Sequence, residues 1–174
     1  YHGMHAMEIV NFGCVIVGWD DDNGHCYEDM LRGGERIFCI ATDDNHNHMA
    51  DDSPNCDSFG GYTMVAAESL DYRAVTDALR RGQFYASSGT STHVGPEIRS
   101  LVYEDGVVTI KTSDVRDIFY MTDSRSCSLT RARDGETINE ASFRVRDGER
   151  WFRLVVVDRE GYKAYTNAYF PDTF

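Results

Sequence analysis

Short apolar runs alternate with segments of helical periodicity in the first part of the chain. The runs have the length and composition of strands, and they occupy residues 5–11, 36–42, 62–67 and 84–87. Helical patterns precede the second run, at residues 27–32, and the fourth run, at residues 71–82. Strands that alternate with helices in this order predict a parallel α/β unit.

The segment at residues 71–82 has the clearest helical signal. Its apolar stripe includes Ala74 and Ala78, which are four residues apart and therefore share one face of a helix. Asp71 is placed to accept hydrogen bonds from the first turn, and Gly82 is placed to end the helix. These residues predict a helix that begins after Asp71 and stops at Gly82.

After Gly95 and Pro96, the spacing of apolar residues changes to the two-residue period that is typical of strands. Candidate strands occupy residues 98–103, 107–112, 117–122, 141–145, 151–158 and 164–169. Turn signals containing glycine separate most of them, and this spacing is typical of an antiparallel β-sandwich. We therefore expect two domains, a parallel α/β domain at residues 1–95 and a small antiparallel β-sandwich at residues 96–174.

Charge and metal-binding residue types are concentrated in the first of these parts. The 174 residues carry a formal charge of -12, and residues 1–95 contain 15 acidic against 5 basic side chains. All six histidines and four of the five cysteines also precede residue 96. An acidic chain is a poor match for a phosphate backbone, so we expect no nucleic-acid partner. Imidazoles and carboxylates together are the ligands that divalent metals select.

The cysteines indicate a reducing environment. They are odd in number and form no C-x-x-C pair, which disfavours both a disulfide framework and a structural zinc knuckle. We therefore expect a cytoplasmic protein. No apolar stretch approaches the roughly 20 residues that a membrane span needs, so no membrane partner is expected.

The best candidate site follows the strand at residues 36–42. Asp44 and His46 are two residues apart just beyond its carboxyl end, where α/β folds place their chemistry. Their oxygen and nitrogen atoms suit zinc, manganese or iron. An Asp/Asn-rich stretch after a strand is also typical of a simple turn. Spacing alone leaves both interpretations open.

The amino-acid sequences of several segments, taken in their order along the chain, bear on the choice between these two interpretations. They are residues 6–11, residues 27–31 with Gly34, and residues 40–46, 60–67, 78–89 and 164–168. In this order they resemble the PHP (polymerase and histidinol phosphatase) superfamily. They are most similar to stand-alone proteins in which a metal-dependent phosphoesterase barrel is followed by a small β-domain. The resemblance covers nearly the whole chain.

The resemblance implies a distorted seven-stranded β/α barrel with two or three divalent metal ions at its C-terminal mouth. Asp44 and His46 match the last metal-ligand motif of the family, whereas its first-strand His-x-His has no counterpart here. The chain is thus expected to be the C-terminal portion of a PHP-type protein, with the first strands removed or carried by another chain. Asp44 and His46 would then belong to a site that this chain leaves incomplete.

Four further residues are weaker candidates for contact with the substrate or with the metal ligands. They are Glu8, Asn11, Asp43 and His48. Glu8 and Asn11 are more typical of a satisfied polar pair inside the barrel, and His48 of the surface of a loop. His93 lies in the segment Thr90–Val94, which separates Gly89 from Gly95 and departs from the family pattern. Its role stays open.

Two functions follow from the sequence. The first is a metal-dependent hydrolase of the PHP type that acts on a small phosphoester. The alternative is a non-enzymatic binding or assembly module that uses the β-sandwich, with the α/β part as scaffold. Barrel strands without their neighbours would expose an unpaired edge, so we expect self-association or association with the missing N-terminal portion.

Overall fold

The computed structural model describes residues 3–19, 23–46, 49–50, 53 and 55–173. The helices are α1 (Phe12–Ile16), α2 (Gly24–Arg32) and α3 (Tyr72–Arg81), with a short 3-10 helix at Pro171–Thr173. The strands are β1 (Ala6–Asn11), β2 (Phe38–Thr42), β3 (Gly61–Val65), β4 (Phe84–Ser88), β5 (Ile98–Glu104), β6 (Val107–Val115), β7 (Asp117–Thr122), β8 (Ser128–Arg131), β9 (Ile138–Arg144), β10 (Phe152–Val157) and β11 (Lys163–Thr166).

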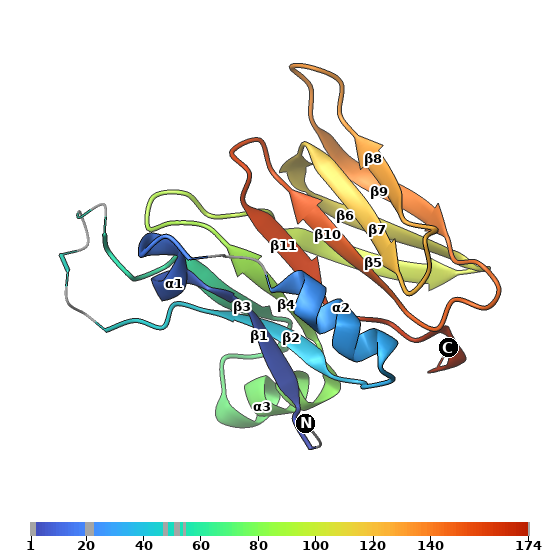
Figure 1. Ribbon diagram of the computed structural model, residues 1–174, viewed down its shortest axis with the longest axis horizontal. Coiled ribbons are helices and arrows are strands. Elements are labelled where there is room, and N and C mark those ends of the chain that lie inside the picture. Colours follow the sequence, from blue (N-terminus) through green and yellow to red (C-terminus); the bar gives the residue numbers. More distant parts are fainter. Residues whose placement is uncertain (1–2, 20–22, 47–48, 51–52, 54, 174) are drawn as a thin grey trace.

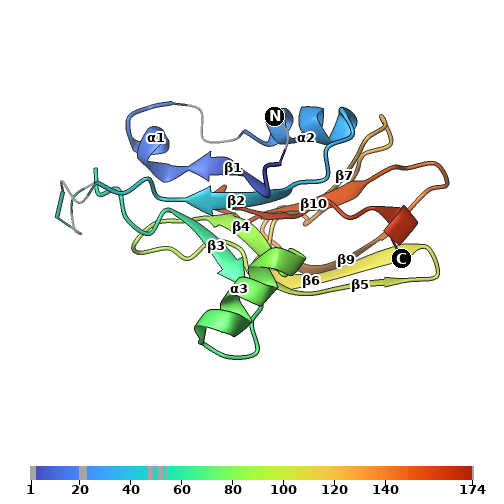
Figure 2. The same ribbon diagram turned by 90° about the horizontal axis from the view of Figure 1, so that it is seen from below.

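These elements form three layers (Figure 2). The first contains the parallel pair β1–β2 together with α2, which Figure 1 shows lying across the central sheet. The central layer is a six-stranded antiparallel sheet in the order β3-β4-β11-β10-β7-β8. The third is the antiparallel sheet β5-β6-β9.

Strand β10 is central because both of its faces are covered. All six of its residues are buried, and its side chains alternate between two hydrophobic cores. Phe152, Leu154 and Val156 face the core shared with β5, β6 and β9, whereas Val155 and Val157 face the core under the β1–β2 layer. A strand with apolar residues on both faces fits only between two packed layers.

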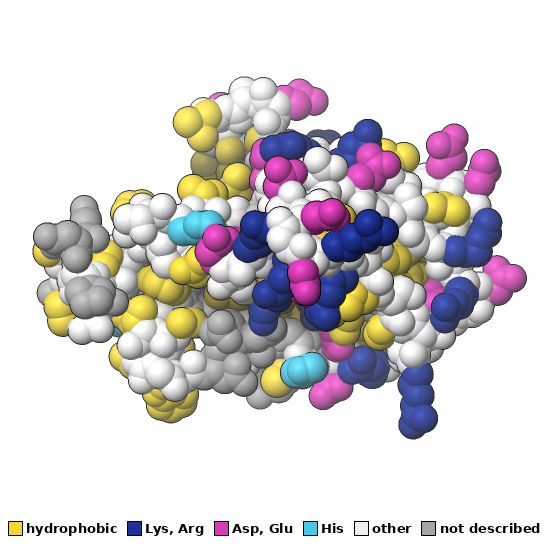
Figure 3. Space-filling view, turned by 90° about the horizontal axis from the view of Figure 1, so that it is seen from above, with side chains coloured by type: hydrophobic (Ala, Val, Ile, Leu, Met, Phe, Trp, Pro, Cys, Tyr) yellow, Lys and Arg dark blue, Asp and Glu magenta, His cyan; other side chains and the backbone are white. Residues whose placement is uncertain are grey.

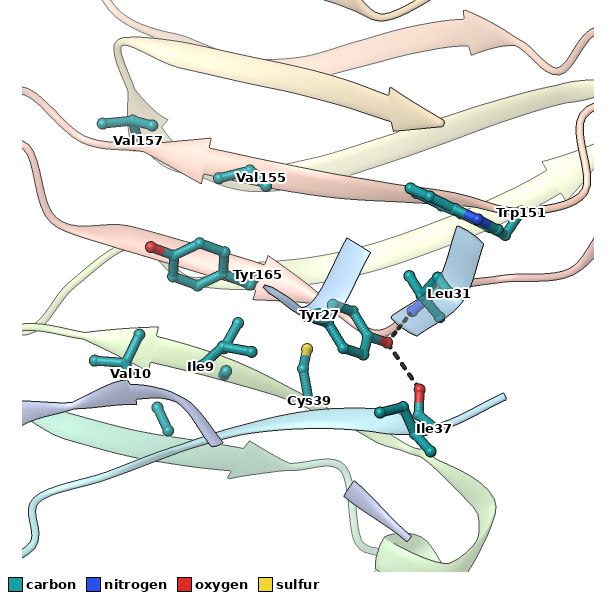
Figure 4. Packing of buried hydrophobic residues seen from close by; sticks show 13 residues of the cluster. Ile9, Val10, Tyr27, Leu31, Ile37, Cys39, Trp151, Val155, Val157 and Tyr165 are labelled. Carbon is teal, nitrogen blue, oxygen red and sulfur yellow. Dashed lines mark hydrogen bonds between the residues drawn. The ribbon is translucent and has the colours of Figure 1, made fainter. Parts of the chain in front are cut away.

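The core under the first layer joins β1, β2 and α2 to the central sheet. Figure 4 shows Ile9 and Cys39 facing Tyr27 and Tyr165 across this core. The Tyr27 hydroxyl donates to the carbonyl of Ile37 at 2.9 Å and accepts from the amide of Ala168 at 3.1 Å. Helix α2, β2 and the segment after β11 are therefore joined by one buried side chain.

A buried ion pair holds α2 on the sheet. Arg153 is the one charged residue of β10, and its Nη2 lies 2.7 Å from Oε1 of Glu28, with both side chains less than 5% exposed. The guanidinium also lies over the rings of Tyr27 and Tyr165. A buried charge is tolerated only when paired, so this contact fixes which face of α2 meets the sheet.

Asn167 connects three elements through its buried amide. Its Oδ1 accepts from the backbone amide of Cys39 in β2 at 2.8 Å. Its Nδ2 donates to the carbonyls of Gly82 and Phe84, at the end of α3 and the start of β4, at 3.0 and 2.9 Å. Strand β2 has no backbone ladder to the central sheet, so this side chain replaces part of one.

Several predictions are confirmed. Asp71 accepts from the amides of Arg73 and Ala74 at the start of α3, and Gly82 ends the helix with a left-handed φ of 71°. Two antiparallel sheets pack face to face, as the second half of the sequence predicts, although β8 was not expected. The pair β1–β2 is parallel, as expected for an α/β unit.

Other expectations are wrong. Strands β3 and β4 are antiparallel despite the helix between them, and β4 pairs with β11 rather than with β2. The sequence predicts only a portion of a barrel, and the described residues form no closed barrel. Strands from both sides of residue 96 share the central sheet. The division into domains at residue 96 stays a prediction.

None of the described helices is long and apolar enough to cross a membrane. On the face shown in Figure 3, acidic side chains lie among the basic ones. Asp117, whose side chain is only 1% exposed, is paired with Arg131 at 2.6 Å and Arg116 at 2.9 Å. Burial by itself would raise the pKa of Asp117, but hydrogen bonds from the two arginines outweigh it and hold the pKa below its usual value.

Replacing Asn167 tests its connecting role. Asn167→Leu keeps a similar volume but deprives one buried amide and two carbonyls of this partner, so unfolding should become easier by at least about 2 kcal/mol. Urea unfolding followed by circular dichroism measures the change. Exposed Asn139 provides the control, because Asn139→Leu should change stability by less than about 0.5 kcal/mol. Equal effects of the two substitutions would contradict the role assigned to Asn167.

Candidate functional site

The predicted residues Asn11 and Asp44 meet at the carboxyl ends of β1 and β2. Asn11 Nδ2 donates to Oδ2 of Asp44 at 3.3 Å and to Oε2 of Glu8 at 3.1 Å. The other Glu8 oxygen accepts from the hydroxyl of Thr42, the last residue of β2. Glu8 and Asn11 thus form a hydrogen-bonded pair that also contacts Asp44.

Asp43 has a structural role in the same region. Its Oδ2 accepts from the amide of Phe59 at 2.7 Å, and its Oδ1 accepts from the amides of Gly60 and Gly61, both at 2.8 Å. Both carboxylate oxygens are therefore engaged by the backbone that leads into β3. This arrangement places the Asp43 side chain in loop organisation rather than in ligand contact.

The backbone of Asp44 is strained. Its φ of 50° is in the left-handed region, which is uncommon for residues other than glycine. Gly13 packs directly on this turn: its amide donates to the carbonyl of Asp43 at 2.8 Å, and an added Cβ would lie 3.2 Å from the carbonyl of Asp44. Close packing against α1 therefore supports the strained conformation.

Asp44 and His46 line one cavity of about 500 Å³. Its lining includes the apolar side chains of Cys14, Ile16, Val17 and Met49 and the polar side chains of Asp44, His46, Asn55 and Asp57. Both residues that the sequence singled out as metal ligands thus lie in the wall of the same cavity.

Asp57 is the residue of this cavity that the sequence did not indicate. Its Oδ2 accepts from the backbone amide of His46 at 2.7 Å and lies 3.9 Å from the Nδ1 atom of that ring. Its Oδ1 is buried and has no hydrogen-bond partner among the described residues. An anionic oxygen that is buried without a partner is costly, and a cation would satisfy it.

The side chains of this cavity are of the types that bind a divalent metal, but their ligand atoms are too far apart to coordinate one ion without movement. Asp44, His46 and Asp57 supply two carboxylates and one imidazole, which suit zinc, manganese or iron. The described residues of this cavity do not bring three ligand atoms within 4.8 Å of one another. Because the His46 side chain is 62% exposed, it has room to rotate towards a bound ion.

One group in the described part of the chain does bring three ligand atoms within that distance. It consists of His93, in the loop after β4, with Asp158 and Glu160 in the turn between β10 and β11. The His93 Nε2 atom lies 2.8 Å from Oδ2 of Asp158 and 3.9 Å from Oε2 of Glu160. The sequence drew attention to His93 but not to its two acidic neighbours.

The structure does not favour a serine or a buried cysteine as a nucleophile. The hydroxyls of Ser87 and Ser88 donate to the carbonyl of Lys163, and no described contact joins them to His93. Burial raises the pKa of the Cys39 thiol to about 12, so this cysteine is protonated at neutral pH.

The two remaining histidines in the described part of the chain, His5 and His25, do not add to these groups. His5 Nε2 contacts the carbonyl of Leu79, and His25 is exposed on α2. His48, a weaker candidate from the sequence, lies outside the described residues.

No protein-family model matches the chain, and no curated protein matches it in sequence.

Adjacent aspartates should respond differently to substitution. Asp43→Ala leaves three backbone amides without their acceptor and should lower the free energy of unfolding by about 2 kcal/mol. Asp44→Gly removes a carboxylate but also relieves the left-handed strain, so stability should change by less than about 1 kcal/mol. Urea unfolding of both variants checks this. A large loss in Asp44→Gly would make Asp44 a structural residue and remove the reason to regard it as a ligand.

Proposed function

We propose that this chain belongs to a metal-dependent hydrolase of the PHP type that acts on a phosphoester, and that Asp44, His46 and Asp57 are metal ligands. The observation that carries the proposal is the buried, unpartnered Oδ1 atom of Asp57 beside His46 in the cavity that Asp44 lines. The choice of reaction rests on the resemblance of the ordered sequence segments to this superfamily.

The position of the cavity supports the proposal. Strands β1 and β2 are parallel, and Asn11 and Thr42 end them in matching register. The carboxyl ends of parallel strands are where α/β folds bind ligands. Asp44 and His46 follow β2 directly, so the fold places their backbone at that edge.

Three protein ligands with an open position are the usual arrangement of a catalytic zinc site. When bound, a divalent ion supplies Lewis-acid polarisation of the phosphoester and activation of water. Asn11 donates to Asp44 and Glu8 accepts from Asn11, so this pair orients the Asp44 carboxylate. Asp43 holds the end of the loop that leads into β3, which fixes the start of the ligand segment.

The cavity also suggests the form of the substrate. Its lining combines apolar side chains, among them Ile16, Val17 and Met49, with the proposed ligands. A small phosphoester with an apolar alcohol group would place its phosphate towards Asp44 and His46 and its apolar part on α1.

The outer edge of β1 is where the proposal places further strands of the hydrolase. Among the described strands, β1 pairs with β2 alone. An unpaired strand edge is a template for another strand, from a second copy or from another part of the same protein. The five cysteines are all free, which fits the reducing cytoplasm proposed as its location.

Hydrolysis of an aryl phosphate in the presence of Mn²⁺ tests the proposed function. The chain should hydrolyse p-nitrophenyl phosphate only with the metal present, and loss of a ligand in Asp44→Asn or His46→Ala should lower the rate at least tenfold, about the lower limit for loss of a supporting partner. Asn11→Ala should have a smaller effect, because Asn11 acts through Asp44.

Asp29→Asn is the matched control, because Asp29 is exposed on α2 and its side chain is 78% accessible. Its rate should equal that of the parent chain. Absence of Mn²⁺-dependent hydrolysis, or an Asp44→Asn rate equal to that of Asp29→Asn, would contradict the proposal. Either result would favour the alternative of a non-enzymatic binding module built on the β-sandwich.

A further inference from the structure

We propose that His93, Asp158 and Glu160 form a second divalent-metal site, which fastens the loop after β4 to the turn between β10 and β11. The proposal is independent of the proposed hydrolase function. It rests on the convergence of one imidazole and two carboxylates, whose ligand atoms all lie within 4.8 Å of one another.

The spacing of the three atoms suits a metal ion. Ligand bonds of zinc to nitrogen and oxygen are about 2.0–2.2 Å, so neighbouring ligand atoms lie roughly 3–3.5 Å apart. The distances from His93 Nε2 are 2.8 Å to Asp158 Oδ2 and 3.9 Å to Glu160 Oε2. A bound ion therefore requires these two distances to change by less than about 1 Å.

Asp158 is held in the orientation that a ligand needs. Its Oδ1 accepts from the backbone amides of Gly161 and Tyr162, both at 2.8 Å. These bonds leave Oδ2 directed at His93, and the side chain is only 9% exposed. Backbone groups that hold a carboxylate in this way act as the outer shell of many metal sites.

The backbone and the ring of His93 are also held in place by neighbouring residues. Its backbone amide and carbonyl bond to Thr90, which closes a tight turn. Its ring stacks on Tyr162 with centroids 4.8 Å apart. Gly95 contributes as well, because an added Cβ would lie 1.8 Å from the carbonyl of Ser88. Close packing of Gly95 on the end of β4 therefore anchors the loop that carries His93, although Ser91, Thr92 and Val94 in it are exposed.

Glu160 distinguishes a metal site from a simple His–Asp hydrogen bond. A neutral imidazole can donate the proton on Nε2 to one carboxylate, and Asp158 already occupies that position. A second carboxylate at 3.9 Å leaves two negative charges beside one nitrogen. A divalent cation neutralises both charges and bonds all three atoms.

We commit to zinc as the ion. One imidazole with two carboxylates is a borderline donor set, and among common biological divalent ions zinc binds such sets more tightly than manganese or iron. A site whose fourth position is open to solvent is consistent with Glu160, whose side chain is 56% exposed.

Calorimetric titration with Zn²⁺ tests the site in an Asp44→Asn/His46→Ala background, which removes the proposed hydrolase ligands. One Zn²⁺ per chain should bind, and Glu160→Gln or His93→Ala should weaken binding at least tenfold, which is about the least expected when a partner of the metal is lost. His25→Ala, at an exposed histidine of α2, should leave binding unchanged. Zn²⁺ should also raise the melting temperature of the background variant but not of its Glu160→Gln derivative.

Glu160→Gln keeps the test decisive if His93→Ala disturbs the fold, because Glu160 is exposed and makes no described hydrogen bond that the turn depends on. No Zn²⁺ binding in the background variant would overturn the proposal, as would binding that survives both substitutions. The background variant already lacks Asp44 and His46. The result of this titration therefore does not depend on whether the proposed hydrolase function is correct.

Discussion

The hydrogen bonds of the buried Asn167 amide determine where β2 lies, and the rest of the structure depends on that position. Its Oδ1 and Nδ2 atoms replace a backbone ladder between β2 and the central sheet. The neighbouring Tyr27 hydroxyl and the Glu28–Arg153 pair fix α2 on the same side. Asp44 and His46 follow β2 directly and line the cavity. The buried polar contacts that position β2 therefore also set the position of this cavity.

The local sequence pattern predicted the helices and strands better than it predicted which strands pair with one another. The capped apolar stripe of α3 and the alternation of the later strands depend on residues close in sequence, and both are present. The pairing of β3 and β4 was predicted incorrectly because a helix between two strands usually signals a parallel crossover. Here β4 takes β11 as a neighbour, about 80 residues away, and no local periodicity reports such a pairing.

The same limit applies to the sites. Asp44 and His46 are recognisable because polar ligands directly follow a buried strand, and His93 because its loop departs from the expected spacing. Asp57 comes from an irregular loop, and Asp158 and Glu160 come from a turn 65 or more residues after His93. Only the folded chain brings these side chains beside the residues that the sequence singled out. Both groups combine imidazole with carboxylate, the donor types that divalent cations select.

The most direct test of the central claim, a divalent ion held beyond the end of β2, is paramagnetic broadening of backbone amide signals by Mn²⁺. NMR spectra with substoichiometric Mn²⁺ report proximity even when binding is weak. The account predicts selective loss of the signals of Asp44, His46 and Asp57, while signals of α3 stay sharp. Unchanged signals for these three residues at Mn²⁺ concentrations that broaden other parts of the chain would contradict it.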